Sequence, residues 1–187
     1  MATKIIGLVG YAGSGKDEAA KNMPGWTRVS FADPVRAMAL AIDPIILIAT
    51  PSGVRLSELV ETVGWASAKK HEEVRRLLQR IGTEAVRDII GKDTWLKLAK
   101  AKIGEIDGPV VITDVRFGNE AELIRSLGGK LIRIVREGVG PVNSHVSDSG
   151  IASIAVDAIV PNFGTPRQLG RAVMGAECDK LSEKAVA

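Results

Sequence analysis

Short apolar runs alternate with segments of helical periodicity along most of the chain. Such runs of strand length predict β-strands, and the segments between them predict helices that cover a sheet. Strands that alternate with helices favour a parallel sheet with helices on both faces. We therefore expect an α/β fold with about five parallel strands. The predicted strands are 4–9, 27–31, 110–115, 130–136 and 155–160, and the predicted helices between and after them are 17–23, 119–127 and 166–174.

The segment 32–107 is too long for a simple connection between two neighbouring strands. Its apolar residues recur at helical spacing, which predicts mostly helices, with Gly82 as a break or kink and a further short helix over 94–103. The positions on this apolar stripe are Val74, Leu77, Leu78, Ile81, Ala85 and Ile89. We interpret the segment as a helical, substrate-binding insertion in a single domain, 1–187. Its apolar face could form a homodimer or belong to the core.

The first predicted strand leads into a glycine-rich loop, "GYAGSGKD" at 10–17. Gly10 and the pair Gly15 and Lys16 have the P-loop spacing G-x-x-x-x-G-K, with Asp17 in place of the usual Ser or Thr. Glycines allow successive N–H groups to point at one phosphate chain, and the lysine adds a positive charge. The alternative is a plain glycine-rich turn between a strand and a helix. The order strand, glycine loop, helix favours the phosphate site.

A second candidate site follows the strand over 110–115. Asp114 lies at the carboxyl end of this predicted strand, where α/β sheets bind ligands, and Arg116 lies just beyond it. Next to a P-loop, the carboxylate would face magnesium-bound phosphates and the guanidinium could hold a second phosphate. The alternative is a helix cap followed by a surface arginine.

Polar residues of the insertion lie opposite its apolar stripe. Arg76, Gln79 or Arg80, Thr83 and Arg87 could reach an anionic substrate, or they could form a solvated face with pairs such as Glu72 and Arg76. Further along, His145 lies in a long loop at about 137–156, and loops of this length often close over a site.

Composition narrows the range of functions only moderately. With 187 residues, 45% of them hydrophobic, and a formal net charge of +3, the chain is typical of a globular domain with an anionic ligand. This charge is too low to predict a nucleic-acid polymer as a partner. Cys178 is the single cysteine, which excludes an intrachain disulfide and favours a reducing compartment. We find no signal sequence or membrane span and expect a cytoplasmic protein.

Taken together, these motifs make the chain resemble the bacteriophage deoxynucleoside monophosphate kinases of the P-loop nucleoside-monophosphate kinase superfamily. The resemblance covers nearly the whole chain. It rests on "GYAGSGKD", "FADPVR", "RRLLQRIGTE" with "DTWLKLA", "DVRFGNEAELIRSLGGKLIRIVR", the histidine of "NSHVSD" and "DAIVPNFGT". Members of the family look alike in carrying Asp after the P-loop lysine, which implies that Asp17 is a family trait.

The resemblance implies transfer of the γ-phosphoryl group of ATP to a deoxynucleoside monophosphate, with Mg²⁺ as cofactor, in the host cytoplasm if the chain is phage-encoded. It implies an ATP and magnesium site at Gly10, Gly13, Ser14, Gly15, Lys16 and Asp17, with Asp114 as a second metal ligand. It also implies acceptor or catalytic roles for Arg36, Arg76, Gln79, Trp95, Asp114, Arg116 and Glu120. Arg136 and His145 are implied as lid residues, and Asn162, Gly164 and Thr165 as part of the loop on the donor base. Two alternatives remain, a dephospho-coenzyme A kinase or other small-molecule P-loop kinase, and a nucleotide-binding switch without catalysis.

Overall fold

The computed structural model describes residues 4–48, 52–140 and 150–178 of the chain. It divides into two compact units, the first formed by the described residues of Met1–Ser30 and Ala99–Ala187, the second by those of Phe31–Leu98. Apart from Phe31, the second unit lies within the segment 32–107 that was predicted as a helical insertion. His145 lies outside the described residues.

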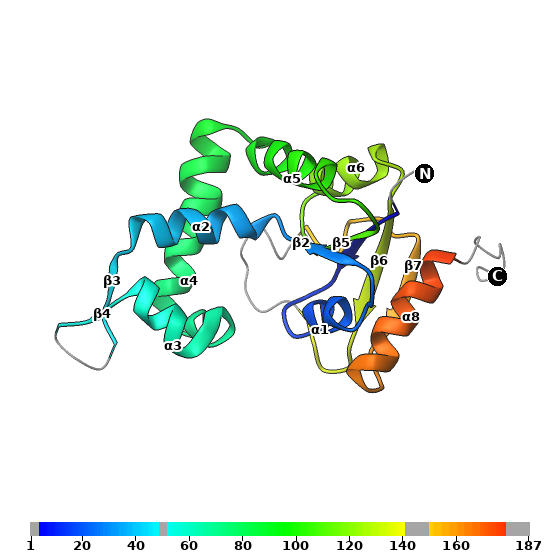
Figure 1. The fold of residues 1–187 in the computed structure, drawn as a ribbon, viewed down its shortest axis with the longest axis horizontal. Coiled ribbons are helices and arrows are strands. Elements are labelled where there is room, and N and C mark those ends of the chain that lie inside the picture. The colour runs from blue at the N-terminus through cyan, green and yellow to red at the C-terminus, as the bar shows by residue number, and fades with distance from the viewer. Residues whose placement is uncertain (1–3, 49–51, 141–149, 179–187) are drawn as a thin grey trace. The chain divides into compact units, whose positions relative to one another are not determined.

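A five-stranded, fully parallel sheet forms the centre of the first unit (Figure 1). Its order is β2-β5-β1-β6-β7, which confirms the predicted class and strand number. The order also makes β5 the direct neighbour of β1, so the loops after these two strands leave the sheet side by side. The strands are β1 (Ile5–Val9), β2 (Thr27–Val29), β5 (Val110–Val115), β6 (Lys130–Val135) and β7 (Ala158–Pro161).

Helices cover both faces of this sheet, as the alternating pattern predicts (Figure 1). One face packs on α1 (Lys16–Lys21) and α8 (Pro166–Cys178), with Ile6, Leu8, Ile132 and Val173 in the shared core. On the other face lies α6 (Gly118–Ser126). A Cβ at Gly7 would lie only 2.5 Å from Cδ1 of Ile124 in α6, so the missing side chain allows this close packing.

The second unit contains α2 (Ala32–Ile42), α3 (Leu56–Ala68), α4 (Glu72–Gln79) and the start of α5 (Thr94–Gly104). It also contains a small antiparallel pair that the sequence did not predict, β3 (Ile45–Ile46) with β4 (Val54–Arg55). Asp43 holds this hairpin to α3, because its carboxylate accepts hydrogen bonds from the N–H and the hydroxyl of Ser57. The Ser57 N–H lowers the pKa of the Asp43 carboxyl.

The predicted break at Gly82 is instead a change of helix type. After α4 the chain continues as a π-helix, η1 (Arg80–Ile90), whose hydrogen bonds span five residues in place of four. The buried residues of η1 are accordingly Ile81 and Val86, and Val86 is 3% exposed. Ala85 and Ile89, which lie on the predicted apolar stripe, are exposed and do not belong to the core, and Ile89 is 80% exposed.

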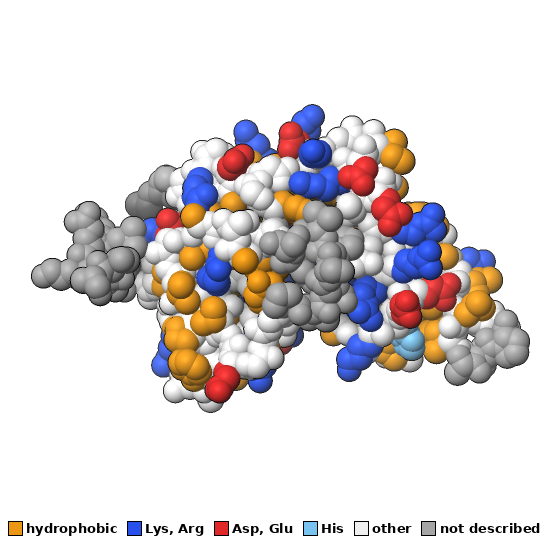
Figure 2. Space-filling view, turned by 180° about the vertical axis from the view of Figure 1, so that it is seen from behind, with side chains coloured by type: hydrophobic (Ala, Val, Ile, Leu, Met, Phe, Trp, Pro, Cys, Tyr) orange, Lys and Arg blue, Asp and Glu red, His pale blue; other side chains and the backbone are white. Residues whose placement is uncertain are grey.

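Apolar and charged side chains are mixed on the molecular surface. On the face drawn in Figure 2, lysines and arginines lie among aspartates and glutamates. Several large apolar residues of the second unit are exposed, and the homodimer stays a prediction. They include Met38, Ile42, Ile45, Leu47, Ile89 and Ile90. Among the described residues, no helix is long and apolar enough to cross a membrane.

Candidate functional site

The glycine loop after β1 has the backbone geometry of a phosphate cradle. Gly13 and Gly15 have φ angles of 84° and 105°, which side-chain-bearing residues rarely adopt. Gly15 is the N-cap of α1, so the loop runs directly into the N-terminal end of a helix. The N–H groups of a helix N-terminus and a nest of glycine N–H groups both attract anions.

Lys16 folds back over this loop. Its ammonium donates hydrogen bonds to the carbonyl oxygens of Gly10 and Tyr11, the latter at 2.7 Å. The hydroxyl of Ser14 lies 3.4 Å from the same ammonium. The positive charge is thus held at the loop by neutral carbonyl oxygens, which a phosphate oxygen could replace as acceptors.

The loop after β7 is tied to the P-loop. The side-chain amide of Asn162 donates to the carbonyl of Ser14 at 2.9 Å, and a Cβ at Gly15 would lie 2.5 Å from that amide nitrogen. Thr165 lies at the start of α8, where its N–H and hydroxyl both donate to Oε1 of Gln168. Gly164 lies against the same Gln168 side chain, and between these anchors Phe163 is 80% exposed.

Asp114 lies at the carboxyl end of β5, at the same edge of the sheet as the P-loop. In the pairing with β1, Gly7 lies opposite Ile112 and Val9 opposite Val115, so β5 contains one extra residue between these pairs. Such a bulge turns nearby side chains away from their regular alternation, often at active sites. The half-buried Asp114 carboxylate accepts a hydrogen bond of 2.6 Å from the hydroxyl of Ser30, which sequence reasoning missed.

Arg116 and Glu120 lie where β5 passes into α6. The buried Glu120 carboxylate accepts hydrogen bonds from the N–H groups of Arg116 and Phe117, at 2.7 and 3.0 Å. Glu120 therefore caps the start of α6 and fixes the backbone from which the Arg116 side chain projects. The predicted acceptor contact of Glu120 stays a prediction.

Asp17, the residue that replaces Ser or Thr in the P-loop, is exposed in the first turn of α1. Its carboxylate lies 4.0 Å from Nε of Arg28. Within the described ranges, no group of three or more His, Cys, Asp or Glu could hold a metal by itself. Asp17 and Asp114 nevertheless fit Mg²⁺, since this ion is usually held by one or two carboxylates together with substrate phosphates and water.

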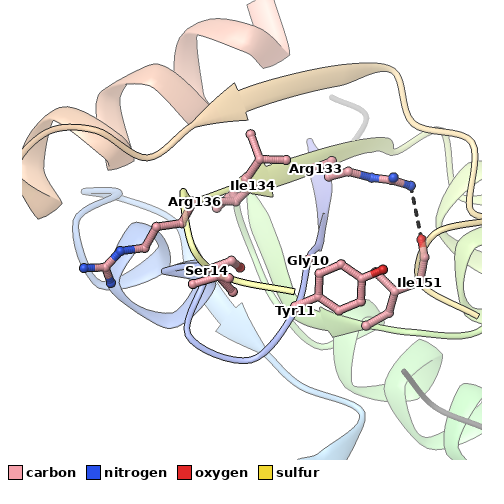
Figure 3. Close-up of a pocket in the computed structure, with 9 residues that line it drawn as sticks. Gly10, Tyr11, Ser14, Arg133, Ile134, Arg136 and Ile151 are labelled. Carbon is pink, nitrogen blue, oxygen red and sulfur yellow. Dashed lines mark hydrogen bonds between the residues drawn. The ribbon is translucent and has the colours of Figure 1, made fainter. Parts of the chain in front are cut away.

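A cavity of about 120 Å³ adjoins the P-loop (Figure 3). It is lined by Gly10, Tyr11, Ser14, Ile134 and Ile151 among others. Arg133 and Arg136 come from the same strand end but extend in opposite directions. Arg136 reaches the carbonyl of Gly13 at 3.4 Å, next to the cradle.

Arg133, which the sequence did not single out, has a structural role. It donates to the carbonyls of Ile151 and Ile154, at 3.1 and 2.6 Å, and so binds the turn before β7 to β6. No motif marks this arginine, because its partners are main-chain atoms that only folding brings near.

Arg36 of the second unit is held in place by two neighbours. Its guanidinium pairs with Asp33 at 3.1 Å and lies 5.9 Å from the ring of Trp65. Both contacts are internal to the second unit and orient the side chain.

The other candidates of the insertion divide into exposed and buried residues. Arg76 is exposed, its side chain has no ion pair or hydrogen bond with any described residue, and it lines a groove of about 380 Å³ with Arg80 and Leu77. Arg80 forms a surface ion pair with Glu84 at 3.6 Å, whereas among the described residues Glu72 and Arg76 form no such pair. Gln79 is half-buried. Trp95 is a core residue that donates to the carbonyl of Gly82 at 2.8 Å, so its substrate contact stays a prediction.

Comparison with known proteins gives a consistent set of matches. A family model described as "Deoxynucleotide monophosphate kinase" matches residues 51–173. A protein of Acanthamoeba polyphaga mimivirus, provisionally named a deoxynucleotide monophosphate kinase, is 32% identical over 86% of this chain and 89% of its own length. The deoxynucleoside-5'-monophosphate kinase of Escherichia phage T5 is 27% identical over 79% of this chain and 84% of its own. Among solved structures, the dephospho-CoA kinase of Campylobacter jejuni covers 93% of this chain and 97% of its own, at 15% identity and a TM-score of 0.42.

Proposed function

This chain belongs to the deoxynucleotide monophosphate kinase family, and from this premise we propose that it transfers the γ-phosphoryl group of ATP to a deoxynucleoside monophosphate. The observation that carries the proposal is the pairing of β1 with β5. Since Val9 lies opposite Val115, the P-loop and Asp114 occupy one edge of one sheet. A phosphate cradle beside a strand-end carboxylate is the arrangement that phosphoryl transfer requires.

In this reaction the P-loop binds the donor. N–H groups around Gly13, Ser14 and Gly15 hold the phosphates, and the Lys16 ammonium exchanges its carbonyl partners for phosphate oxygens. Arg136 approaches from the end of β6, where it contacts the Gly13 carbonyl. Asn162 holds the loop that carries the exposed Phe163, a suitable surface for the donor base.

The acceptor is held by arginines. Arg116 projects from the capped start of α6, and Arg36 and Arg76 are the guanidinium groups of the second unit that we assign to the monophosphate. Gln79 is assigned to the same substrate. In this proposal Phe31–Leu98 is the acceptor-binding insertion of a kinase domain.

The transfer itself needs little proton chemistry. An oxygen of the acceptor phosphate, largely dianionic near pH 7 because its second pKa is about 6, forms the new bond to the γ-phosphorus. The bond between that phosphorus and the bridging oxygen of ADP breaks, and ADP keeps the electron pair. Lys16 and the arginines position the groups and neutralise charge. Mg²⁺, when held by Asp17 and Asp114, supplies further charge neutralisation at the phosphates.

A coupled assay of ADP release tests the proposal. We expect turnover with one or more deoxynucleoside monophosphates and none with dephospho-coenzyme A. Turnover with dephospho-coenzyme A alone would identify the other kinase class. ATP binding without release of ADP for any acceptor would identify a nucleotide-binding switch.

A further inference from the structure

Ser30 makes a short contact between two strands that are distant in sequence. It follows the last residue of β2, is only 3% exposed, and its hydroxyl lies 2.6 Å from Oδ2 of Asp114. This length is typical of a hydroxyl that donates to a carboxylate, which is among the stronger hydrogen bonds of proteins. Because β2 is the direct neighbour of β5, the sheet itself brings the two residues together.

The position of Asp114 makes such a partner necessary. The bulge in β5 between the Ile112 and Val115 pairs interrupts the regular ladder at this residue. In addition, rotation of a carboxylate about its last bond is broad and weakly restrained. A fixed donor on one oxygen therefore selects one orientation of the carboxylate plane.

We propose that Ser30 is a positioning residue of this kinase, which orients the Asp114 carboxylate toward the phosphates and Mg²⁺ at the P-loop. The inference rests on the proposed function. Ser30 acts through Asp114 and not on the substrate. Its hydroxyl fixes the carboxylate before the nucleotide binds, so that less reorganisation accompanies binding and transfer.

The chain offers a matched control for this hydroxyl. Thr113, the residue before Asp114 in the same bulge, is 2% exposed, and its hydroxyl has no hydrogen-bond partner among the described residues. Thr113→Val removes a buried hydroxyl at nearly constant volume without removing a hydrogen bond. Ser30→Ala removes a buried hydroxyl together with its bond to Asp114.

The experiment compares wild type, Ser30→Ala, Thr113→Val, Asp114→Asn and the double variant of Ser30 and Asp114. Calorimetry measures binding of an unreactive ATP analogue with and without Mg²⁺, and the ADP-release assay measures kcat and KM. We expect Ser30→Ala to lower kcat about tenfold and to weaken only the Mg²⁺-dependent binding, by several-fold. Thr113→Val should match wild type. Adding Ser30→Ala to Asp114→Asn should cause no further loss, because the two residues act as one unit.

Wild-type values for Ser30→Ala, or an undiminished effect of that change in the Asp114→Asn background, would overturn the proposal. If Ser30→Ala does not fold, Ser30→Cys replaces it, because cysteine keeps a small side chain with a weaker hydrogen-bond donor. Ser30→Cys should raise the Mg²⁺ concentration needed for half-maximal binding of the ATP analogue. An unchanged Mg²⁺ concentration would equally overturn the proposal. Absence of ADP release by the wild type would refute the kinase reaction instead, and calorimetry would still decide the role of Ser30.

Discussion

The side-chain amide of Asn162 donates a hydrogen bond to the main-chain carbonyl of Ser14 across 2.9 Å, although the two residues are 148 positions apart. The loop after β7 thereby supports the P-loop from the side. Because that amide also lies against Gly15, it shapes the turn that begins α1. Donor binding should consequently depend on a residue outside the glycine motif.

Asn162→Ala should weaken binding of an unreactive ATP analogue about tenfold, or about 1.4 kcal/mol, because the P-loop loses its lateral support. Acceptor binding should not change. Separate calorimetric titrations of the two ligands measure this. Gln168→Ala, which removes side-chain contacts with Gly164 and Thr165 but keeps the bond from Asn162 to Ser14, is the comparison, and it should weaken ATP binding less than Asn162→Ala does. Equal losses in both variants would assign Asn162 to general stability.

Lys16→Ala should reduce kcat by several orders of magnitude and leave the fold intact, because the lost charge acts chiefly on the transferred phosphoryl group. The control is Lys21→Ala in the same helix, where the lysine is exposed and pairs with Glu18 at 2.7 Å. Turnover and circular dichroism of both variants check this. Kinase activity at the wild-type level in Lys16→Ala would refute the P-loop assignment.

Asp17→Asn should raise the Mg²⁺ concentration needed for the half-maximal rate and change thermal stability little. Asp17 lies in the first turn of α1, after the N-cap Gly15, so a purely structural role predicts a small loss of stability from the lost charge and no change in the metal dependence. Glu18→Gln, in the same exposed first turn of α1, is the control for loss of charge. Rates over a Mg²⁺ titration distinguish the two roles.

Arg116→Lys should weaken monophosphate binding and slow transfer by roughly ten- to a hundredfold, about 1.4 to 2.7 kcal/mol. Lysine keeps the charge but loses the two-pronged contact of a guanidinium with phosphate. Affinity for the ATP analogue should barely change. Arg125→Lys on α6, whose guanidinium donates to the carbonyl of Ala155, is the control. Equal loss of donor and acceptor affinity would place Arg116 on the donor side.

Val86→Asp should destabilise the protein by several kcal/mol, because it buries a carboxylate at a position 3% exposed. Ile89→Asp should change the free energy of unfolding by no more than about 0.5 kcal/mol, since Ile89 is 80% exposed. Urea denaturation of both variants measures the difference. The reverse order would show that 80–90 packs as an α-helix.

Elements that depend on neighbouring residues could be predicted from the amino-acid sequence. The five strands follow from short apolar runs, and the observed boundaries differ from the predicted ones by three residues at most, the largest difference being the later start of β7 at Ala158. The glycine loop with Lys16 was recognisable because its glycines must adopt backbone angles closed to other residues. Asp114 was placed at a strand end from the length of one apolar run alone.

Which distant groups meet, and which helical register is adopted, depends on packing across the whole fold. A period of 3.6 residues describes an α-helix, so it placed Ala85 and Ile89 on one apolar stripe with Ile81. Packing selected a π-helix, which moves burial to Val86. Likewise, the bonds from Ser30 to Asp114 and from Asn162 to Ser14 join residues that share no local pattern. Their partners are fixed by strand order, which arises from the burial of the whole sheet and leaves no mark on any short stretch of sequence.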